Sequence, residues 1–138
     1  MGYRRKSREL VLQALFYMDI RNQFSRKTLE LFKKYLTQGE SDFFNSLSAG
    51  VIENKDDIDK FIEDHSNNWR LNRMSCVDRN ILRFAVYELY YCEEIPFKVS
   101  INEAIDIGKR FGTRESGSFI NGLLDSIRKT LEKKGMEK

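Results

Sequence analysis

Four of the first eight residues are basic, and no acidic residue lies among them. These residues are Arg4, Arg5, Lys6 and Arg8. The apolar periodicity that follows places them in the first turns of a helix, where the helix dipole is positive and each cation costs about 0.3–1 kcal/mol. Helix stability alone would favour Asp or Glu here. The cluster therefore indicates a binding site for a polyanion, and its alternative interpretation is a solvated terminus that aids solubility.

No arrangement typical of catalysis or metal binding is found in the sequence. His65, the only histidine, lies in a polar, acid-rich stretch without a nucleophile motif, and we expect it at the surface or at the core boundary. Cys76 and Cys92 form no CxxC pair, so we interpret them as buried free thiols in a reducing compartment. The stretch Gly-Lys-Arg at 108–110 lacks the rest of a phosphate loop. We therefore predict a protein without enzymatic activity, metal or cofactor.

The composition is typical of a single globular domain. Of the 138 residues, 41% are hydrophobic and 33% charged, which is enough apolar content for a sizeable core. Pro96 is the only proline, so helix breakers are nearly absent and we predict an all-α fold. No apolar run is long enough to span a membrane, and Gln13 interrupts the short run at 10–15 that a signal peptide would need. We therefore expect a cytoplasmic protein.

The formal net charge of +3 is small, but the charges are unevenly distributed. Residues 53–64 contain six acidic residues and two lysines, whereas the N-terminus and residues 128–134 are basic. One end of the molecule is thus expected to attract phosphates and another to repel them.

Hydrophobic spacing predicts six helices. They cover approximately residues 4–21, 25–38, 42–62, 78–92, 100–111 and 116–131. The residues expected to begin or end them are Ser25, Gly39, Asp78, a capping box from Ser100 to Glu103, and Gly112. These helices are the elements that would position the basic cluster and any residues that act with it.

Two further features bear on how the helices pack. The polar stretch at 66–68 separates two expected subdomains, about residues 1–68 and 69–138, and Trp69 and Leu71 follow it at once. Gly117 and Gly122 lie inside the last helix, where each costs about 1 kcal/mol relative to Ala. We expect them to permit the close approach of a neighbouring helix or of a ligand.

Short sequence blocks over residues 69–127 resemble the NusB family of transcription antitermination factors. The blocks are, in chain order, Trp69-Arg-Leu-Asn-Arg-Met74, Val77-Asp-Arg-Asn-Ile-Leu-Arg83, Tyr87-Glu-Leu89, Ile95-Pro96, Val99-Ser-Ile-Asn-Glu-Ala-Ile105, Lys109-Arg-Phe-Gly112, Ser116 and Phe119-Ile-Asn-Gly-Leu-Leu-Asp125. The basic opening Arg4-Arg-Lys-Ser-Arg-Glu9 and Gln13-Ala-Leu15 extend the resemblance to the other end of the chain. Between residues 22 and 68 it is limited to length, helical character and Ala49-Gly50-Val51. The order and spacing of the blocks make the resemblance specific.

The resemblance implies an all-α helical bundle of about six to seven helices in two packed subdomains. It also implies a non-enzymatic protein that binds the boxA element of nascent RNA together with NusE, which is also a protein of the small ribosomal subunit. The resulting complex helps RNA polymerase to pass termination signals, notably in ribosomal RNA operons. The family needs no cofactor, and some of its members form homodimers that cover the RNA-binding face.

The resemblance also implies roles for individual residues. The arginine-rich opening of the family corresponds to the four basic residues of the N-terminal cluster, which would contact phosphates and base edges. Phe119 matches an aromatic position implicated in RNA contact, where a ring could stack on an unpaired base, although it also fits the apolar stripe of its helix. Asp78 matches an acidic position that faces NusE, and helix capping would equally explain it. Glu115 falls where the family often has an acid near the RNA, and Ser118 replaces a lysine of some relatives.

We hypothesise that the basic cluster binds single-stranded RNA through its phosphates and exposed bases. If four phosphates are neutralised, the logarithm of the binding constant should fall with the logarithm of salt concentration with a slope of roughly −3. Replacing the four cations by Ala is expected to lower RNA affinity while the fold survives. So small a footprint predicts weak binding by the protein alone, and tight binding would need the surface of a partner.

Two alternatives to RNA binding by an antitermination factor stay open at this point. The first is a helical protein-interaction module whose basic end contacts an acidic protein. The second is the NusB-like domain of certain RNA methyltransferases, in which a catalytic domain follows this one. The sequence ends at Lys138 without a Gly-rich cofactor loop, so we expect the antitermination factor rather than the methyltransferase domain.

Overall fold

The structure is a computed structural model that describes residues 2–36, 41–67 and 69–138. Over these residues the chain forms seven α-helices, one short 3-10 helix and no strand. The elements are α1 (Gly2–Ile20), α2 (Arg26–Lys33), α3 (Asp42–Glu53), α4 (Lys55–Asp64), the 3-10 helix η1 (Leu71–Arg73), α5 (Cys76–Tyr91), α6 (Phe97–Phe111) and α7 (Ser116–Lys133). The all-α fold expected from the sequence is therefore confirmed.

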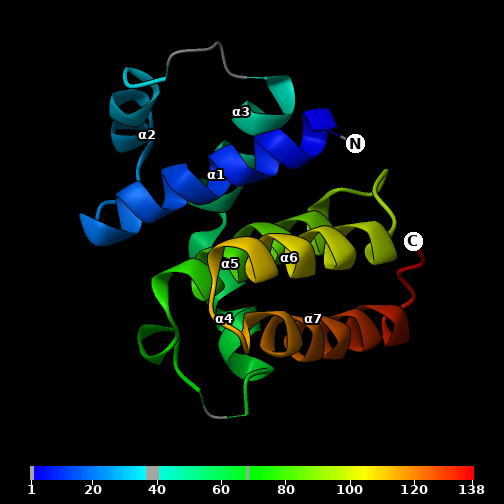
Figure 1. The fold of residues 1–138 in the computed structure, drawn as a ribbon. Coiled ribbons are helices and arrows are strands. Elements are labelled where there is room, and N and C mark those ends of the chain that lie inside the picture. The colour runs from blue at the N-terminus through cyan, green and yellow to red at the C-terminus, as the bar shows by residue number, and fades with distance from the viewer. Residues whose placement is uncertain (1, 37–40, 68) are drawn as a thin grey trace.

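Helix α5 lies at the centre of the molecule and packs against α1, α3, α4, α6 and α7. Figure 1 shows α1, α2 and α3 grouped on one side and α4 to α7 on the other. The apolar stripes predicted for these helices face the space around α5 and exclude water from it. The largest fully buried side chains are Phe44, Phe84, Leu15, Met18, Leu29, Leu47, Ile58, Ile62, Ile81, Leu82, Leu89 and Ile95.

The prediction of one long helix over 42–62 is wrong, because this segment forms two helices, α3 and α4, that meet at Asn54. The Asn54 side-chain amide donates a hydrogen bond to the Gly50 carbonyl oxygen at 2.9 Å. An asparagine side chain that bonds locally to the backbone competes with helix propagation. After the break α4 packs against α5 and α7. Helix α4 thus lies on the same side of the molecule as the later helices. The division into subdomains at about residue 68 stays a prediction.

Two expected helix starts are also corrected. Helix α5 begins at Cys76, because the Ser75 hydroxyl accepts a hydrogen bond from the Asp78 amide at 3.0 Å and caps the first turn. The capping box expected at Ser100 and Glu103 is not one, since α6 begins earlier, directly after Pro96. Pro96 is the residue just before the first helical one, where its missing N–H costs no hydrogen bond of the helix. Both side chains of the supposed box instead bind other helices.

Other expected boundaries are confirmed. The Ser25 hydroxyl caps α2 by accepting from the Thr28 amide at 3.1 Å, α6 ends at Gly112, and α7 begins at Ser116. Gly39, expected to end the second helix, lies outside the described residues.

The two glycines inside α7 have different surroundings. A Cβ at Gly117 would lie 3.2 Å from the Lys109 side chain of α6, so close helix approach is confirmed there. A Cβ at Gly122 would meet no atom of the described residues within 4 Å, so none of the described helices approaches it closely.

The residues that could carry reactive chemistry are engaged in the fold. His65 is half-buried at the core boundary, as expected, and its ring nitrogens bond to the Phe61 carbonyl and the Thr130 hydroxyl, each at 2.9 Å. Cys76 and Cys92 are free, half-buried rather than fully buried, and desolvation raises the pKa of Cys92 to about 11. Among the described residues no cluster of His, Cys, Asp or Glu could hold a metal ion. None of the helices in the described ranges has the length and apolarity needed to cross a membrane.

Candidate nucleic-acid interface

The first two turns of α1 expose only part of the predicted basic cluster. Arg4 and Lys6 are exposed, and neither forms an ion pair with a described residue. The Arg4 guanidinium lies 4.8 Å from the centre of the Phe43 ring of α3 in a cation–π contact. This contact orients Arg4 while leaving its charge accessible to an anion.

Arg8 is buried, and the expectation that it forms part of the exposed cluster is corrected. Its side chain is 2% exposed, and its Nε and Nη2 donate to the two Glu88 carboxylate oxygens at 2.7 and 2.8 Å. The Ser100 hydroxyl donates to the same carboxylate at 2.8 Å. Arg8 therefore ties α1 to α5 inside the core, because a buried guanidinium needs a buried counter-charge.

Arg5 is partly exposed and is held by two carboxylates of α6. Its Nε and Nη2 donate to Glu103 at 2.6 and 2.7 Å, and Nη2 also donates to Asp106 at 3.0 Å. The hydrogen bonds to Glu103 raise the pKa of Arg5, and in return they lower the pKa of Glu103. Arg4 and Lys6 are thus the two cations of the cluster that have no acidic partner among the described residues.

A second group of candidate residues surrounds Phe119, near the start of α7. Two adjoining hollows, of about 380 and 250 Å³, share Trp69 and Phe119 in their walls. We call them together the aromatic cleft. Trp69 is 55% exposed and Phe119 is half-buried, packed against the core with the rest of its ring open to the cleft. Two rings beside an open hollow are suited to stacking on an unpaired base.

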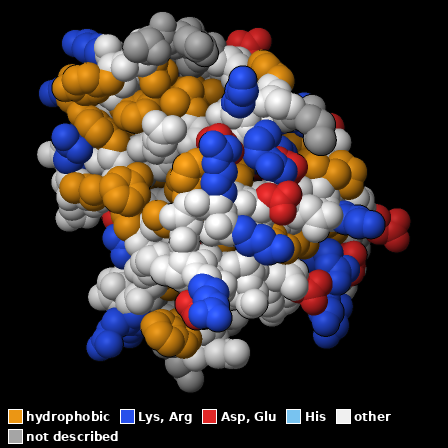
Figure 2. Space-filling view, in the orientation of Figure 1, with side chains coloured by type: hydrophobic (Ala, Val, Ile, Leu, Met, Phe, Trp, Pro, Cys, Tyr) orange, Lys and Arg blue, Asp and Glu red, His pale blue; other side chains and the backbone are white. Residues whose placement is uncertain are grey.

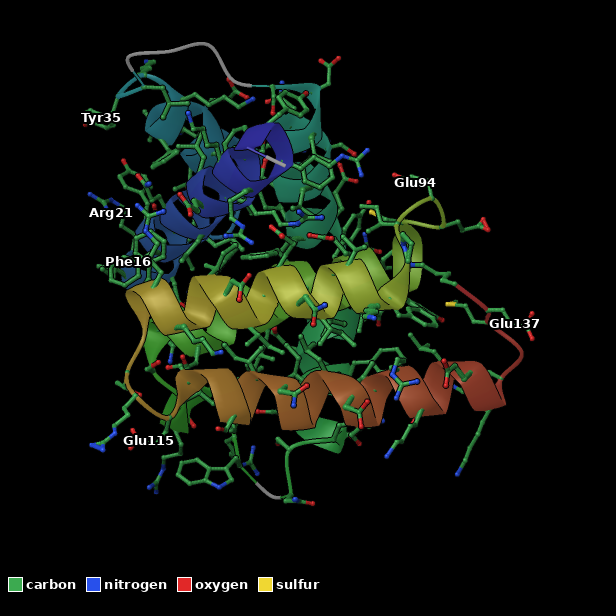
Figure 3. All side chains as sticks on the ribbon, turned by 45° about the vertical axis from the view of Figure 1, so that its right-hand side comes forward. Phe16, Arg21, Tyr35, Glu94, Glu115 and Glu137 are labelled. Atoms are coloured by element: carbon green, nitrogen blue, oxygen red, sulfur yellow. The ribbon has the colours of Figure 1, made fainter. Side chains whose placement is uncertain are left out.

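Asp78 lies in the wall of the same cleft but is almost fully buried. Its carboxylate accepts a hydrogen bond from the Ser116 hydroxyl at 2.7 Å. This bond joins the start of α5 to the start of α7 and so fixes the turn that carries Phe119. Glu115 is exposed at the rim of the cleft, at the beginning of α7 (Figure 3), and Ser118 lines the other hollow.

The basic end of α1 and the aromatic cleft are separate on the surface. Arg5 contacts the middle of α6, whereas α7 begins beyond the end of α6, and Figure 1 shows the N-terminus far from the start of α7. Three exposed cations follow Arg5's partners along the chain: Lys109 and Arg110 in the last turn of α6 and Arg114 in the connection to α7, and of these Arg110 is paired with Glu9. A ligand that touches both parts must therefore be extended.

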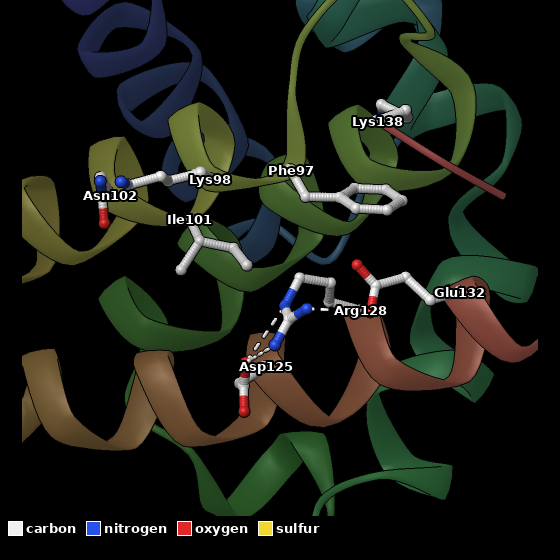
Figure 4. Close-up of a pocket in the computed structure, with 8 residues that line it drawn as sticks. All are labelled: Phe97, Lys98, Ile101, Asn102, Asp125, Arg128, Glu132 and Lys138. Carbon is white, nitrogen blue, oxygen red and sulfur yellow. Dashed lines mark hydrogen bonds and ion pairs between the residues drawn. The ribbon is translucent and has the colours of Figure 1, made fainter.

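Another hollow, of about 400 Å³, lies between α6 and α7 (Figure 4). Its arginine, Arg128, donates to Asp125 and Glu132 on its own helix, as the dashed lines in the figure mark. With its charge balanced in this way, Arg128 is poorly suited to capture a phosphate.

Four apolar side chains are exposed on one part of the surface, which we call the apolar strip: Phe16 and Ile20 of α1, Leu31 of α2, and Tyr35 just after α2. Figure 2 shows several orange side chains over the part of the surface formed by α1 and α2, and Figure 3 shows that Phe16 and Tyr35 lie on the same side of the molecule. Exposed fractions are 64% for Ile20, 41% for Leu31 and 73% for Tyr35. Phe16 and Ile20 are four residues apart and outside the buried stripe of α1, which is the signal by which the sequence could have revealed them. The sequence reasoning missed this strip and also missed the exposure of Trp69.

Comparison with known proteins gives the family. A sequence profile described as the NusB family matches residues 5–129. The transcription antitermination protein NusB of Desulfatibacillum aliphaticivorans is 56% identical over 129 residues, which cover 92% of this chain and 90% of the relative. The chain belongs to the NusB family. The resemblance inferred from the sequence blocks is therefore confirmed over most of the chain.

Solved NusB structures have the same fold. T. maritima NusB superposes with a TM-score of 0.78 and 42% identity, and the match covers 91% of this chain and 90% of that one. A structure of the antitermination factors NusB and NusE in complex with dsRNA superposes with a TM-score of 0.81, over 94% of this chain and 98% of that one. The identity to that protein is 24%, so this likeness concerns the fold.

Proposed function

We propose that this protein is a non-enzymatic transcription antitermination factor that binds boxA-type single-stranded RNA together with NusE. The observation that carries the proposal is the 56% identity, over nearly the whole chain, to a transcription antitermination protein. A solved relative of the same fold was crystallised with NusE and dsRNA, which supports both an RNA ligand and this protein partner. The protein would act in the cytoplasm, on nascent RNA at the antitermination complex of RNA polymerase, notably in ribosomal RNA operons.

The RNA site that we propose has two parts. Arg4 and Lys6 would bind phosphates at the basic end of α1, with Arg5 available after release from its carboxylates. Phe119 and Trp69 would stack on unpaired bases in the aromatic cleft. Arg8 supports the site from the core through its ion pair with Glu88.

Only two cations of the cluster are freely accessible, so RNA affinity should depend less on salt concentration than the sequence predicted. Neutralising two phosphates of a single strand predicts a slope of about −1.4 in the logarithm of affinity against the logarithm of salt concentration. So few contacts support a composite site, in which NusE supplies the rest of the RNA-binding surface.

We propose the apolar strip on α1 and α2 as the surface for NusE. The exposure of Ile20, Leu31 and Tyr35 supports this choice, because large exposed apolar groups at one place are typical of protein interfaces. Asp78 was expected to face this partner. Its buried hydrogen bond with Ser116 supports instead an indirect role, in which it holds the start of α7.

Fluorescence anisotropy with a labelled boxA RNA and a scrambled RNA, each with and without NusE, tests the proposal. We expect weak binding by the protein alone and selectivity for boxA that arises when NusE is added. Arg4→Ala with Lys6→Ala should weaken binding and flatten the salt slope. A matched control replaces Lys60 and Lys133, exposed lysines of α4 and of the last turn of α7, by Ala. Equal binding of both RNAs in the presence of NusE would contradict the proposal.

A protein-interaction module without an RNA ligand makes the opposite prediction. Capture of partner proteins by the tagged protein would then survive nuclease treatment, and the Arg4 and Lys6 variants would leave RNA affinity unchanged.

A further inference from the structure

Arg5 is surrounded by more negative charge than it carries. Three of its hydrogen bonds go to two carboxylates, at distances between 2.6 and 3.0 Å. Glu103 is 15% exposed and Asp106 is 52% exposed, so both charges are close to the surface on which RNA would lie. One guanidinium between two carboxylates presents a net negative site to an approaching phosphate.

Contacts to the core and to α3 hold the backbone around Arg5 in place. Arg8, one turn further along α1, is bound to Glu88 in the core, and its Nη1 also lies 3.5 Å from Glu103. The Ser7 and Ser41 hydroxyls, 2.7 Å apart, tie the same turn to the start of α3. Arg5 therefore cannot leave its carboxylates by a movement of α1, and only its side chain, which is 33% exposed, can turn away.

We propose that Glu103, assisted by Asp106, restrains Arg5 and thereby limits the RNA affinity of the protein. In this arrangement a phosphate must displace the carboxylates before it can use the third cation of the cluster. Glu103 is then a positioning residue that acts on RNA binding through Arg5. The inference rests on the proposed RNA-binding function of the basic turn.

The test measures RNA affinity and stability on the same variant, Glu103→Gln, which keeps the shape of the side chain and removes its charge. We expect the affinity for boxA RNA to rise roughly twofold to fivefold, the range for one partly exposed ion pair. The salt slope should become steeper by about 0.7, since one more phosphate is neutralised. The melting temperature should fall, because a contact between α1 and α6 is lost. A residue with a purely structural role would lower both affinity and stability.

A matched control comes from a second ion pair between the same two helices. Arg110 donates to Glu9 at 2.9 Å, so Glu9→Gln removes one negative charge from the same pair of helices without touching Arg5. A double-mutant cycle then combines Glu103→Gln with Arg5→Ala. If Glu103 acts through Arg5, the gain in affinity disappears in the Arg5→Ala background.

The outcomes separate this inference from the proposed function. An equal gain from Glu9→Gln, or a gain that persists without Arg5, would show that Glu103 acts only through general charge and would overturn the inference. A loss of affinity in Glu103→Gln would overturn it as well. Failure of the proposed RNA site has a different signature, because Arg4→Ala and Lys6→Ala would then leave RNA binding unchanged.

Discussion

Arg4 and Arg8 are one helical turn apart, but Arg4 is exposed and Arg8 is buried. Arg4 is exposed beside Phe43, whereas Arg8 is 2% exposed and neutralised by Glu88. The same residue type therefore contributes binding charge at one position and core stability at the next turn. Alanine substitutions in this cluster cannot be interpreted as a uniform loss of charge.

Arg8→Ala should lower the free energy of unfolding by about 3–5 kcal/mol, because it leaves the Glu88 carboxylate buried without its counter-charge. Arg4→Ala should cost less than about 1 kcal/mol, the value of an exposed cation–π contact. Urea denaturation followed by circular dichroism compares the two. The sequence led us to expect that the fold survives replacement of all four cations by Ala. The structure changes this expectation: the fold should survive only in variants that keep Arg8. Equal stability of the two variants would contradict this assignment.

Phe119 is the second residue whose role can be tested alone. Phe119→Ala should weaken boxA binding by roughly fivefold to a hundredfold, the range for loss of one base–aromatic stack. Phe119→Tyr keeps the ring and should bind within about twofold of the native protein. Anisotropy titrations at constant salt measure both. Loss of binding in Phe119→Tyr, with its fold intact, would argue against stacking.

At the scale of elements, the connection between α6 and α7 determines where the aromatic cleft lies. The Ser116 hydroxyl accepts from the Thr113 amide at 2.9 Å and donates to Asp78 at 2.7 Å. Gly112 ends α6 directly before this turn, and a Cβ there would lie 2.3 Å from the Ser116 hydroxyl oxygen and 2.8 Å from the Gly108 carbonyl oxygen. Only glycine leaves room for the hydroxyl that holds α7 in place.

Gly112→Ala should therefore lower the free energy of unfolding by about 1–3 kcal/mol, as is usual for overpacking. It should also weaken RNA binding, because α7 and Phe119 must shift. Gly122→Ala is the control, since its Cβ would meet no atom of the described residues within 4 Å and an alanine inside a helix should stabilise the protein by about 0.5–1 kcal/mol. Thermal melting of both variants measures the difference. The same sign for both would refute the steric explanation.

At the scale of the whole molecule, a charged network connects both groups of helices. Asp19 of α1 accepts two hydrogen bonds from Arg79 at 2.7 Å, and Arg83 bridges Asp19 to Asp59 of α4. Burial of Asp19 would raise its pKa, but the hydrogen bonds from Arg79 and Asn80 and the charges of Arg79 and Arg83 outweigh burial. Together they lower the pKa from 3.8 to about 2. The carboxylate is thus stabilised in its ionised form by folding.

This shift fixes the sign of a pH dependence. Because the pKa of Asp19 is lower in the folded protein than in the unfolded chain, its contribution to stability is complete above about pH 4 and is lost as the pH falls toward 2. Asp19→Asn should flatten the stability profile in this range while lowering stability at neutral pH. Urea denaturation at a series of pH values measures the profile. An unchanged slope between pH 4 and 2 in the variant would show that other carboxylates dominate acid unfolding.

Much of the fold was predictable because it depends on local patterns. The stripe of apolar residues in each helix, together with stops such as Gly112 and the start at Ser116, follows from helix period and capping, which neighbouring residues determine. The helix start predicted at Ser100 was wrong because the side chains there bind residues that are distant in the sequence. Ser100 and Glu103 have the spacing of a capping box, yet they bind Glu88 and Arg5.

The sequence by itself determined the all-α class, the family, and the presence of basic and aromatic residues suited to RNA. Only the tertiary structure decided which of those residues are accessible. It buried Arg8 against Glu88, held Arg5 with Glu103, and placed Trp69 beside Phe119, fifty positions away in the sequence. Periodicity reports which face of a helix is apolar, whereas exposure and charge pairing depend on the helix packed opposite, and one helix's own residues do not specify that partner.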